Sequence, residues 1–599
     1  MDLTIDEIKT ANYRLFHATC WQSFFRKEPD FNGKEMSLYS RIIKTITEFD
    51  EKLGIVACPA LKHAQAMRKQ INKVSTQYFK DNPPPKNQFD VKDVISKIFK
   101  DFKDVIIVPS DKNLGPVALL IEDYNFLVNQ HLDNLENFEP LLKRDYTSKQ
   151  FDFIKIKFNS TKEFIKFKPD ILEETNILHK RILENLYPFE SKARNLVEKY
   201  FDSFEEKSFK LPHFKVLPKL HKKYEKLPST RPLTAATRAF TTPTSVILDM
   251  ELQPKMLNYP SILKNTLSLT QYIKEWNNNL PIINSPIFMF SIDVVNLYPS
   301  IDLEKLYSIL NKLNPLYKDM AKFICSNNYV TYNDYVYRQK KGLATGTNCA
   351  VPLANLFLAE TLDRLLINDK IQTFRRYIDD IFGIWKGTEA EFIEFFNLLN
   401  KASPIPLTYT IGKEIVFLDL TITLNDDNKI DYKTYQKIQS RFQYITPRSF
   451  HPSHTFIGMI IGELKRLMRN SSKEAFYLSS RSLFLERLVR MGFPRFSVIK
   501  IFQQYPWNDE IIPPREKTRP LLLTLIIRFT NLTALNKALK DTLRDIYKEF
   551  MDYDPDAFNN SFKKPPKYLL VFKVDKNLLK LTTSSGLYPH HKRLLNKLR

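Results

Sequence analysis

Glycine and cysteine are scarce in this sequence, with 12 and 4 residues among 599. Cys20, Cys58, Cys325 and Cys349 lie far apart and form no CxxC pair, which argues against a disulfide framework and against a zinc site. The longest apolar run, Leu521 to Ile527, is too short to span a bilayer, and the N-terminus lacks the apolar core of a signal peptide. We therefore expect an intracellular protein with no membrane segment.

Positive charge is in excess, with 90 Lys and Arg residues against 67 Asp and Glu and a formal net charge of +23. This excess suits a polyanionic partner, because each neutralised phosphate releases condensed counterions. A generally basic soluble surface would have the same composition. Hydrophobic residues make up 43% of the chain, which is enough for a large core, and the length allows several domains.

Two adjacent carboxylates, Asp379 and Asp380, lie in the segment RRYIDDIFGIW (375–385). The apolar runs on either side predict a β-hairpin whose tight turn carries both. Neighbouring anions repel each other and are costly to desolvate, so the pair favours a divalent metal site over a solvated turn. Asp293, at the end of the apolar run 287–292, is the expected third carboxylate. Two-metal sites of this kind stabilise the attacking and leaving oxygens of phosphoryl transfer.

The few glycines gather around this predicted hairpin. Gly342, Gly346, Gly383, Gly387 and Gly412 fall within about seventy residues. Glycine is required where φ is positive or where the backbone approaches another group closely. We therefore expect unusual backbone geometry beside the carboxylates.

Proline positions and hydrophobic periodicity divide the chain. The first eighty residues have helical patterns, which end at DNPPPK (81–86) because this segment cannot continue a helix. The pattern then predicts a strand pair at 104–124, a largely helical region at 121–210, extended segments at 214–222 and 229–235, alternating strands and helices at 286–425, and helices again from Tyr432.

Taken in order, these segments resemble reverse transcriptases of Penelope-like retroelements, a group related to telomerase. The motifs that carry the resemblance span roughly residues 105–581: PSDKNLGPVALL, LPKLHK, STRPLTA, SIDVVNLYPSI, GLATGTNCAVPLANLFLAE, YIDD, FLDLTI and SFHPSHTFIGMIIGELKRLMR. The resemblance implies an α+β right-hand polymerase with fingers, a ferredoxin-like palm and a thumb. The implied divisions are a helical N-terminal region (1–85), fingers (86–285) with a helical insertion (121–210), a palm (286–430), a helical thumb (431–545) and a C-terminal segment (546–599).

The resemblance also implies roles for individual residues. Asp293, Asp379 and Asp380 would bind two Mg²⁺ ions, for which Mn²⁺ can substitute, with Val294 as a further metal ligand. They would catalyse nucleotidyl transfer from a dNTP to a primer 3′-hydroxyl. Tyr298 would pack under the sugar of the incoming nucleotide and exclude a 2′-hydroxyl, and a Tyr buried in an ordinary core is the alternative.

Three further residues match positions that contact the nucleotide. Lys112 and Arg231 would hold the triphosphate, since Arg suits bidentate phosphate contacts and Lys supplies a point charge; either could instead be a solvated surface cation. Gly346 would let the backbone approach the template-primer and the nascent base pair. Thr345 and Asn348 depart from the usual pattern in this loop, which affects nucleotide selection or loop rigidity but removes no catalytic ligand.

The segment FLDLTI (417–422) would be the primer grip, a hairpin in which Phe417 and Leu418 contact the primer terminus. Lys413, just before it, is a candidate proton donor to the departing pyrophosphate, and a solvated loop lysine is an equal alternative.

The expected thumb contains a helix with apolar residues on one face. Lys465, Arg466 and Arg469 lie on its other faces and would track the phosphates of a duplex, or they would simply be solvated. His451 and His454 have no Cys partners nearby, so a capping or backbone-bonding role is favoured over a metal site.

The implied partners are an RNA template, a DNA or RNA primer, dNTPs and the RNA of the element itself, in the nucleus. GLY at 586–588 is not a GIY-YIG motif, so we expect no DNA cleavage. A catalytically inactive polymerase fold that binds nucleic acid is one alternative, and a cellular end-extending polymerase is another. The presence of all three carboxylates with Tyr298 and Arg231 argues against inactivity.

Overall fold

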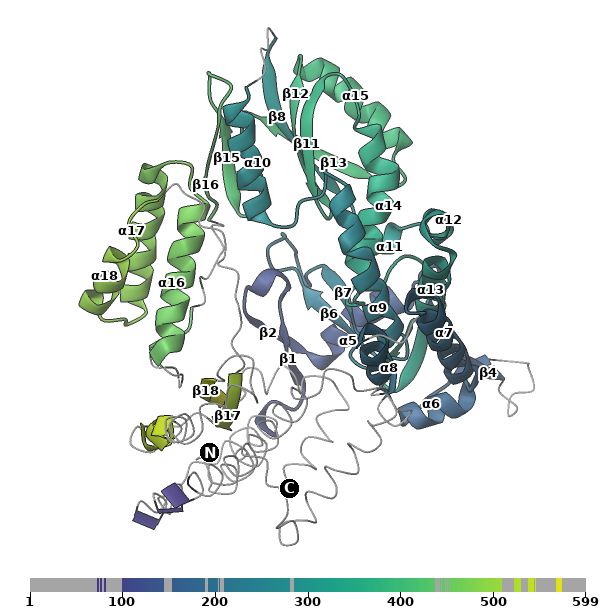
Figure 1. The fold of residues 1–599 in the computed structure, drawn as a ribbon. Coiled ribbons are helices and arrows are strands. Elements are labelled where there is room, and N and C mark those ends of the chain that lie inside the picture. The colour runs from purple at the N-terminus through teal and green to yellow at the C-terminus, as the bar shows by residue number, and fades with distance from the viewer. Residues whose placement is uncertain are drawn as a thin grey trace. The chain divides into compact units, whose positions relative to one another are not determined.

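The computed structural model describes residues 100–144, 153–188, 192–202, 209–280, 285–436, 453–508, 522–528 and 567–573, with isolated positions besides. The chain divides into two units, and the one that carries the candidate site contains residues 102–444 and 460–510 (Figure 1). The expected helical region 1–85 lies almost wholly outside the described residues. The expected domain boundaries remain predictions.

Short strands and helices alternate through this unit. Its strands are β1 (Val105–Pro109), β2 (Pro116–Leu120), β3 (Phe138–Pro140), β4 (Leu142–Arg144), β5 (Phe153–Lys155), β6 (His213–Pro218), β7 (Thr230–Ala235), β8 (Ile287–Val294), β9 (Tyr329–Tyr332), β10 (Tyr335–Gln339), β11 (Ile371–Tyr377), β12 (Asp380–Lys386), β13 (Leu407–Gly412), β14 (Glu414–Phe417), β15 (Leu420–Leu424) and β16 (Ile430–Thr434).

The helices are α5 (Ile121–Leu132), α6 (Thr161–Phe167), α7 (Asp170–Leu186), α8 (Lys192–Asp202), α9 (Thr242–Leu252), α10 (Thr266–Asn278), α11 (Leu297–Ser300), α12 (Leu303–Leu313), α13 (Pro315–Ser326), α14 (Ala350–Leu365), α15 (Glu389–Ala402), α16 (Ser453–Arg469), α17 (Glu474–Arg490) and α18 (Arg495–Gln503). Two 3₁₀ turns, η2 (Asp111–Asn113) and η4 (Pro254–Asn258), lie among them. Among the described residues, none of the helices combines the length and apolarity needed to cross a bilayer.

A four-stranded antiparallel sheet carries the candidate site, in the order β11-β12-β8-β13. Along the chain, helices separate β8 from the β11–β12 hairpin, and α15 separates that hairpin from β13. This β-α-β-β-α-β order with β8 and β12 in the centre is the ferredoxin-like arrangement. α15 begins directly after β12 because Thr388 and Glu391 form a capping box.

The two faces of this sheet belong to different cores. Because side chains alternate along a strand, Phe288, Phe290 and Ile292 of β8 pack with α12, α13, α14 and α15 on one face. Ile287 and Met289 pack with α10 and with β14–β16 on the other face. Figure 1 shows α14 and α15 on one side of the strands and α10 on the other. The sheet is therefore covered on both faces.

A second sheet, in the order β3-β10-β9-β6-β7, lies in the part of the chain that the sequence assigns mostly to the fingers. The predicted strand pair at 104–124 is confirmed as the antiparallel hairpin β1–β2. β1, α5, β6 and the β9–β10 hairpin share one core. The extended segments are confirmed at 214–218 and 230–235, which form β6 and β7 and pair antiparallel, whereas residues 219–222 are a turn after β6.

The prediction of a largely helical region at 121–210 is only partly correct. It contains α5, α6, α7 and α8, but also the strands β3, β4 and β5. β3 pairs with β10, almost 200 residues later in the chain, and β4 pairs with β5. The pairing of β3 depends on a distant partner, and β4 and β5 are only three residues long, so none of the three strands could be identified from the local pattern.

A three-stranded sheet, β14-β15-β16, connects the central sheet to the helices α16, α17 and α18. In the other unit, β17 (Leu522–Arg528) and β18 (Lys567–Lys573) pair in parallel. The predicted hairpin at FLDLTI is confirmed as β14–β15, with Phe417 opposite Leu420.

Substitution of two glycines by alanine is expected to change the stability of the protein in opposite directions. A Cβ on Gly383 in β12 would lie 2.3 Å from Cζ of Phe290, whereas a Cβ on Gly462 in α16 would meet nothing within 4 Å. We predict that Gly383→Ala destabilises the protein by about 1–3 kcal/mol through overpacking. Gly462→Ala should stabilise it by about 0.5–1 kcal/mol through helix propensity. Thermal unfolding of the two variants and the wild type measures both changes, and a neutral Gly383→Ala would contradict the packing described.

Candidate active site

The hairpin β11–β12 turns through two residues, Ile378 and Asp379, because Tyr377 pairs directly with Asp380. The predicted hairpin is thus confirmed, but its turn carries only Asp379, because Asp380 is the first residue of β12. Ile378 has a φ of 56°, a left-handed conformation that is a genuine outlier for a β-branched residue. Such strain costs on the order of 1–3 kcal/mol and persists only where surrounding contacts enforce it. The turn therefore carries Asp379 in a conformation that the rest of the fold must hold.

Asp293 and Asp380 lie opposite each other on the adjacent strands β8 and β12. Directly opposed residues on an antiparallel pair have Cβ atoms about 4.5–5.5 Å apart. By strand alternation both point to the face that carries Met289. The backbone N–H of Val294 donates to the carbonyl of Asp379 at 3.1 Å, which ties the hairpin turn to β8. The structure therefore brings the three predicted carboxylates together.

The electrostatics of the three carboxylates are unfavourable. Burial, and then the charges of Asp379 and Asp293, raise the pKa of Asp380 to about 7. Burial and the charge of Asp379 also raise the pKa of Asp293. The two side chains lie within hydrogen-bonding reach of each other, so a proton on Asp380 relieves the repulsion with Asp293. Two anions so close together cannot both ionise readily.

The donor set fits a hard divalent cation, since Mg²⁺ and Mn²⁺ prefer carboxylate oxygens. In the part of the chain that the structure describes, however, no three His, Cys, Asp or Glu side chains are arranged as a ready-made metal site. Asp293 and Asp380 face each other, and a bound cation would have to displace the proton that the raised pKa of Asp380 favours. The side chain of Val294 is buried on the opposite face of the sheet, so only its main-chain carbonyl remains as a ligand.

Two cations lie near these carboxylates, and two more lie close to the first two. The charge of Lys112 lowers the pKa of both Asp293 and Asp380, and Lys222 lowers that of Asp293. Burial lowers the pKa of Lys219, and the charges of Lys222, Arg231 and Lys112 lower it further. These cations come from the η2 turn, from the end of β6 and the loop after it, and from β7, so the fold collects positive charge beside the three acids.

Arg231 is held by Asp111. Its guanidinium donates from Nε to Oδ1 at 3.1 Å and from Nη2 to Oδ2 at 3.5 Å, and Asp111 is almost fully buried. Lys112 is exposed and has a φ of 57°. The buried carboxylate therefore orients Arg231, and the unusual turn exposes Lys112 next to it.

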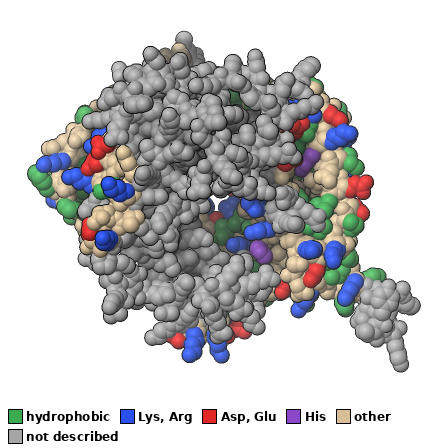
Figure 2. All heavy atoms as spheres, turned by 60° about the horizontal axis from the view of Figure 1, so that its bottom comes forward, with side chains coloured by type: hydrophobic (Ala, Val, Ile, Leu, Met, Phe, Trp, Pro, Cys, Tyr) green, Lys and Arg blue, Asp and Glu red, His purple; other side chains and the backbone are tan. Residues whose placement is uncertain are grey.

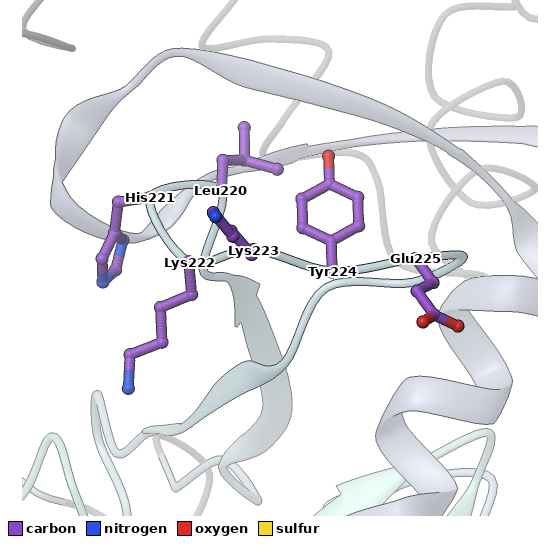
Figure 3. A pocket seen from close by; sticks show the side chains of 6 residues that line it. All are labelled: Leu220, His221, Lys222, Lys223, Tyr224 and Glu225. Carbon is purple, nitrogen blue, oxygen red and sulfur yellow. The ribbon is translucent and has the colours of Figure 1, made fainter.

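The loop after β6 lines a cavity of about 730 Å³, with Leu220–Glu225 as its lining among the described residues. Figure 3 shows His221 and Lys222 extending to one side of this loop and Tyr224 to the other. In Figure 2, Lys and Arg side chains gather with a His in the hollow at the centre of the face shown. Positive charge therefore borders open space in this part of the molecule.

Tyr298 lies beside the carboxylates, on the short helix α11 that follows β8. Burial and the charge of Asp379 raise its pKa, and Arg231 opposes this shift. Its carbonyl accepts the N–H of Leu343 at 2.8 Å, and a Cβ on Gly342 would lie 2.4 Å from that oxygen. The glycine segment thus packs directly against the backbone of Tyr298.

Gly346 lies close to the backbone of β7. It has a φ of 110°, and a Cβ there would lie 2.2 Å from the carbonyl oxygen of Thr234 in β7. The N–H of Thr234 donates to Thr345 at 2.9 Å. Intramolecular packing against β7 explains this glycine, and the predicted contact with nucleic acid is not needed to account for it.

Two predicted residues are placed away from the carboxylates. Thr408 pairs with Asp293, so Lys413, five residues further along the chain, lies about 16 Å from it at 3.3 Å per residue. Its amine pairs with the exposed Asp426 at 2.9 Å. Phe417 is 2% exposed and packs against Phe382 in the core. The proton-donor role of Lys413 and a duplex contact by the Phe417 side chain therefore have no support in this geometry. Leu418, at the hairpin tip with a φ of 55°, is half-buried and packs against the same core as Phe417.

Arg466 has protein partners rather than a free guanidinium. It donates to both carboxylate oxygens of Glu463, at 2.9 and 2.8 Å, and to Asp419 at 2.9 Å. Asp419 also accepts from Asn470 at 2.7 Å and from Thr266 at 2.6 Å. These contacts join α16 and α10 to the tip of the β14–β15 hairpin and give Arg466 a structural role, which the prediction of phosphate contact did not include.

Lys465 and Arg469 are the exposed cations of this helix. Lys465 lies 5.7 Å from the ring centre of Tyr505, and Arg469 donates to the carbonyl of Lys465 at 3.2 Å. His451 Nδ1 is hydrogen-bonded to the hydroxyl of Ser449 at 2.9 Å, in line with a local bonding role. His454 is exposed.

Sequence reasoning did not single out Lys222, Asp111, Asp419 or Arg376 as site residues. The first three lie inside motifs already recognised, and Asp111 and Asp419 also lie next to residues that were named, so their position was the available signal. Arg376 stands directly before the YIDD segment, in a strand where a charged residue would be expected to face solvent. Arg376 is instead completely buried, and the local sequence pattern does not reveal the partners that it has there.

No protein-family model matches the chain, and no curated protein matches it either. Among solved structures, it is similar to telomerase from Candida albicans in complex with a TWJ fragment of telomeric RNA, at 12% identity and a TM-score of 0.37. That match covers 61% of this chain and 65% of the telomerase chain, which is less than two thirds of its length.

Two further solved structures are similar at the same level. Apo telomerase from Candida tropicalis matches at 9% identity and a TM-score of 0.38, over 100% of this chain and 96% of the other. The Sicinivirus 3Dpol RNA-dependent RNA polymerase matches at 12% identity and a TM-score of 0.32, over 51% and 70%. TM-scores below 0.5 are too low to establish a shared function, so the conclusions below depend on strand order and site geometry.

The raised pKa of Asp380 predicts a pH-dependent loss of stability. Its folded pKa of about 7 lies above the unfolded value of about 3.9, so the folded state binds more protons between these pH values. Stability should therefore fall as pH rises through that window. In EDTA, Asp380→Asn should raise the melting temperature at pH 8 on the order of 2 °C and have little effect near pH 4.

Asp426→Asn is the matched control, because the Asp426 side chain is 97% exposed and its pair with Lys413 lowers its pKa. This control should give no stabilisation at pH 8. A melting temperature of Asp380→Asn equal to or below that of the wild type at pH 8 would contradict the repulsion described.

Proposed function

We propose that this protein is an RNA-directed DNA polymerase that adds deoxynucleotides to a primer 3′-hydroxyl. The observation that carries the proposal is the meeting of three carboxylates from β8 and the β11–β12 turn, with a group of four cations beside them. Phosphoryl transfer between nucleotides needs this combination, because negative charge accumulates on the transferred phosphate and both ends of the site must balance it.

The residues of the site have separable roles in this proposal. Lys112, Lys222 and Arg231 bind the triphosphate, and the buried Asp111 keeps Arg231 oriented toward it. Asp293 and Asp379 bind divalent Mg²⁺ or Mn²⁺ together with Asp380, which gives up its proton on binding. When bound, the metal neutralises charge on the attacking and leaving oxygens.

The architecture supports a right-hand polymerase. The ferredoxin-like sheet would be the palm, and the β1–β2 hairpin with the β6–β7 pair would be the fingers. Helices α16, α17 and α18 would be the thumb, in which Lys465 and Arg469 are the cations available to contact duplex phosphates. Within this class, the sequence motifs favour a Penelope-like enzyme with an RNA template, a DNA or RNA primer and a nuclear site of action.

The direct test is primer extension by the purified protein with dTTP, on poly(rA) and on poly(dA) with an oligo(dT) primer. We predict Mg²⁺-dependent extension on poly(rA) and a loss on the order of 10³-fold or more for Asp379→Asn, because one ligand of the site is neutralised. Asp426→Asn should retain wild-type activity.

Three results would contradict the proposal. Absence of extension on both templates would favour a nucleic-acid-binding protein with an inactive site. Extension on poly(dA) alone would favour a DNA-templated enzyme. Near wild-type activity of folded Asp379→Asn would place the chemistry elsewhere.

The position of Tyr298 predicts sugar selectivity. Its side chain is partly buried beside Asp379 and Arg231, between the carboxylates and the triphosphate-binding cations. An aromatic ring against C2′ of the sugar leaves no volume for a hydroxyl, so Tyr298→Ala should relax discrimination against ribonucleotides more than it slows dNTP addition. Measuring kcat/KM for dTTP and UTP in both proteins decides this, and an unchanged ratio would assign Tyr298 to the core.

A further inference from the structure

Arg376 is completely buried in β11, directly before the hairpin turn, and all five of its side-chain N–H groups are used. Nε and Nη2 donate to the two carboxylate oxygens of Asp363, at 2.8 and 3.0 Å. Nη1 donates to the side-chain oxygen of Asn355 at 2.8 Å and to the carbonyl of Ile378 at 3.0 Å. The second bond of Nη2 goes to the carbonyl of Asn355 at 3.0 Å. A guanidinium has five donors, so none remains free.

The partners of Arg376 come from separate parts of the fold. Asn355 and Asp363 lie two turns apart on α14. Ser261 donates its hydroxyl to Asp363 at 2.7 Å, and its carbonyl accepts the N–H of Arg376 at 2.6 Å. The N–H of Leu263 donates to the carbonyl of Arg376 at 2.8 Å. Backbone and side chain of Arg376 are therefore both fixed, by α14 and by the segment before α10.

The bond to Ile378 bears on the proposed chemistry. The Ile378 carbonyl belongs to the peptide group that precedes Asp379, and Ile378 is the residue with the strained φ of 56°. The following carbonyl, of Asp379 itself, accepts the N–H of Val294. Both peptide groups around Asp379 are thus held, one by Arg376 and one by β8, and their orientation determines where its carboxylate points.

We infer that Arg376 is a positioning residue that holds the Ile378–Asp379 turn so that Asp379 faces Asp293 and Asp380, an inference that rests on the proposed function. A buried ion pair by itself is weak support for a stabilising role, because desolvation offsets the attraction. The hydrogen bond from Nη1 of Arg376 to the carbonyl of Ile378 reaches a strained turn at the reactive site. An ion pair with a purely structural role would not require this bond. Outer groups that orient metal ligands typically affect metal affinity or activity 10–100-fold.

The main test variant is Arg376→Lys, which keeps the positive charge but cannot supply five donors in a planar fork. Asn355→Ala is the milder variant, because it removes one acceptor of Nη1 and leaves the pair with Asp363 intact. Arg181→Lys is the control, since Arg181 pairs with Asp319 at 2.7 Å on α7 and α13, away from the hairpin.

The measurements are the single-turnover rate of dTTP addition per folded site, the Kd for primer–template, and the Mn²⁺ concentration at half-maximal rate. We expect a loss of rate of about tenfold or more for Arg376→Lys and a smaller loss for Asn355→Ala, with unchanged duplex Kd and a raised Mn²⁺ requirement. A lower melting temperature with an unchanged rate per folded site would overturn the inference, and if Arg376→Lys does not fold, Asn355→Ala decides on the same criteria.

An inactive wild type would refute the proposed function but not, by itself, the positioning role. In that case Mn²⁺ binding, measured by electron paramagnetic resonance with Asp379→Asn as the reference for loss of the site, decides the inference. Weaker binding by Arg376→Lys than by the wild type and Arg181→Lys supports it. Equal binding, or no Asp379-dependent binding in the wild type, overturns it.

Discussion

Mutual repulsion among three carboxylates is the constraint on which the site depends. Asp293 and Asp380 oppose each other on neighbouring strands, and Asp379 occupies the turn next to them. Burial and this repulsion raise the pKa of Asp380 to about 7. A fold that keeps such a cluster sacrifices stability at neutral pH, which is typical of sites that bind or transfer charge.

Other features of the molecule compensate for this cluster. Lys112 and Lys222 lower the pKa of the acids from outside the sheet. The Arg376 network and the bond from Val294 hold a turn that would otherwise relax. The four-stranded sheet, covered on both faces, provides the rigid base, since Asp293 and Asp380 are in-register members of its central strands. The strained turn is therefore held by β8 and, through Arg376, by α14, which are far apart in the sequence.

Much of this could be predicted from the sequence because its signals are local. Apolar runs predicted β8 and the β11–β12 hairpin, the family resemblance predicted the β14–β15 hairpin, and the glycines near the site marked tight contacts. What could not be predicted depends on partners distant in the chain. Arg466 donates to Asp419, which is 47 residues away in the sequence. Gly346 packs against Thr234, which is more than a hundred residues away.

The strand register explains another difference. Lys413 appears close to the site along the chain, but β13 runs antiparallel to β8 and carries it to the other end of the sheet. Likewise, a lone charged residue in a strand gives no sign of whether it is exposed or, as with Arg376, fully buried with a complete set of partners. Local patterns therefore identified the acids but not the residues that hold them.

The most direct test of the central claim is a crystal structure with Mn²⁺, examined for anomalous scattering from the metal. Our account predicts a peak bound by Asp293, Asp379 and Asp380. Crystals saturated with Mn²⁺ that show no peak at these carboxylates would contradict it.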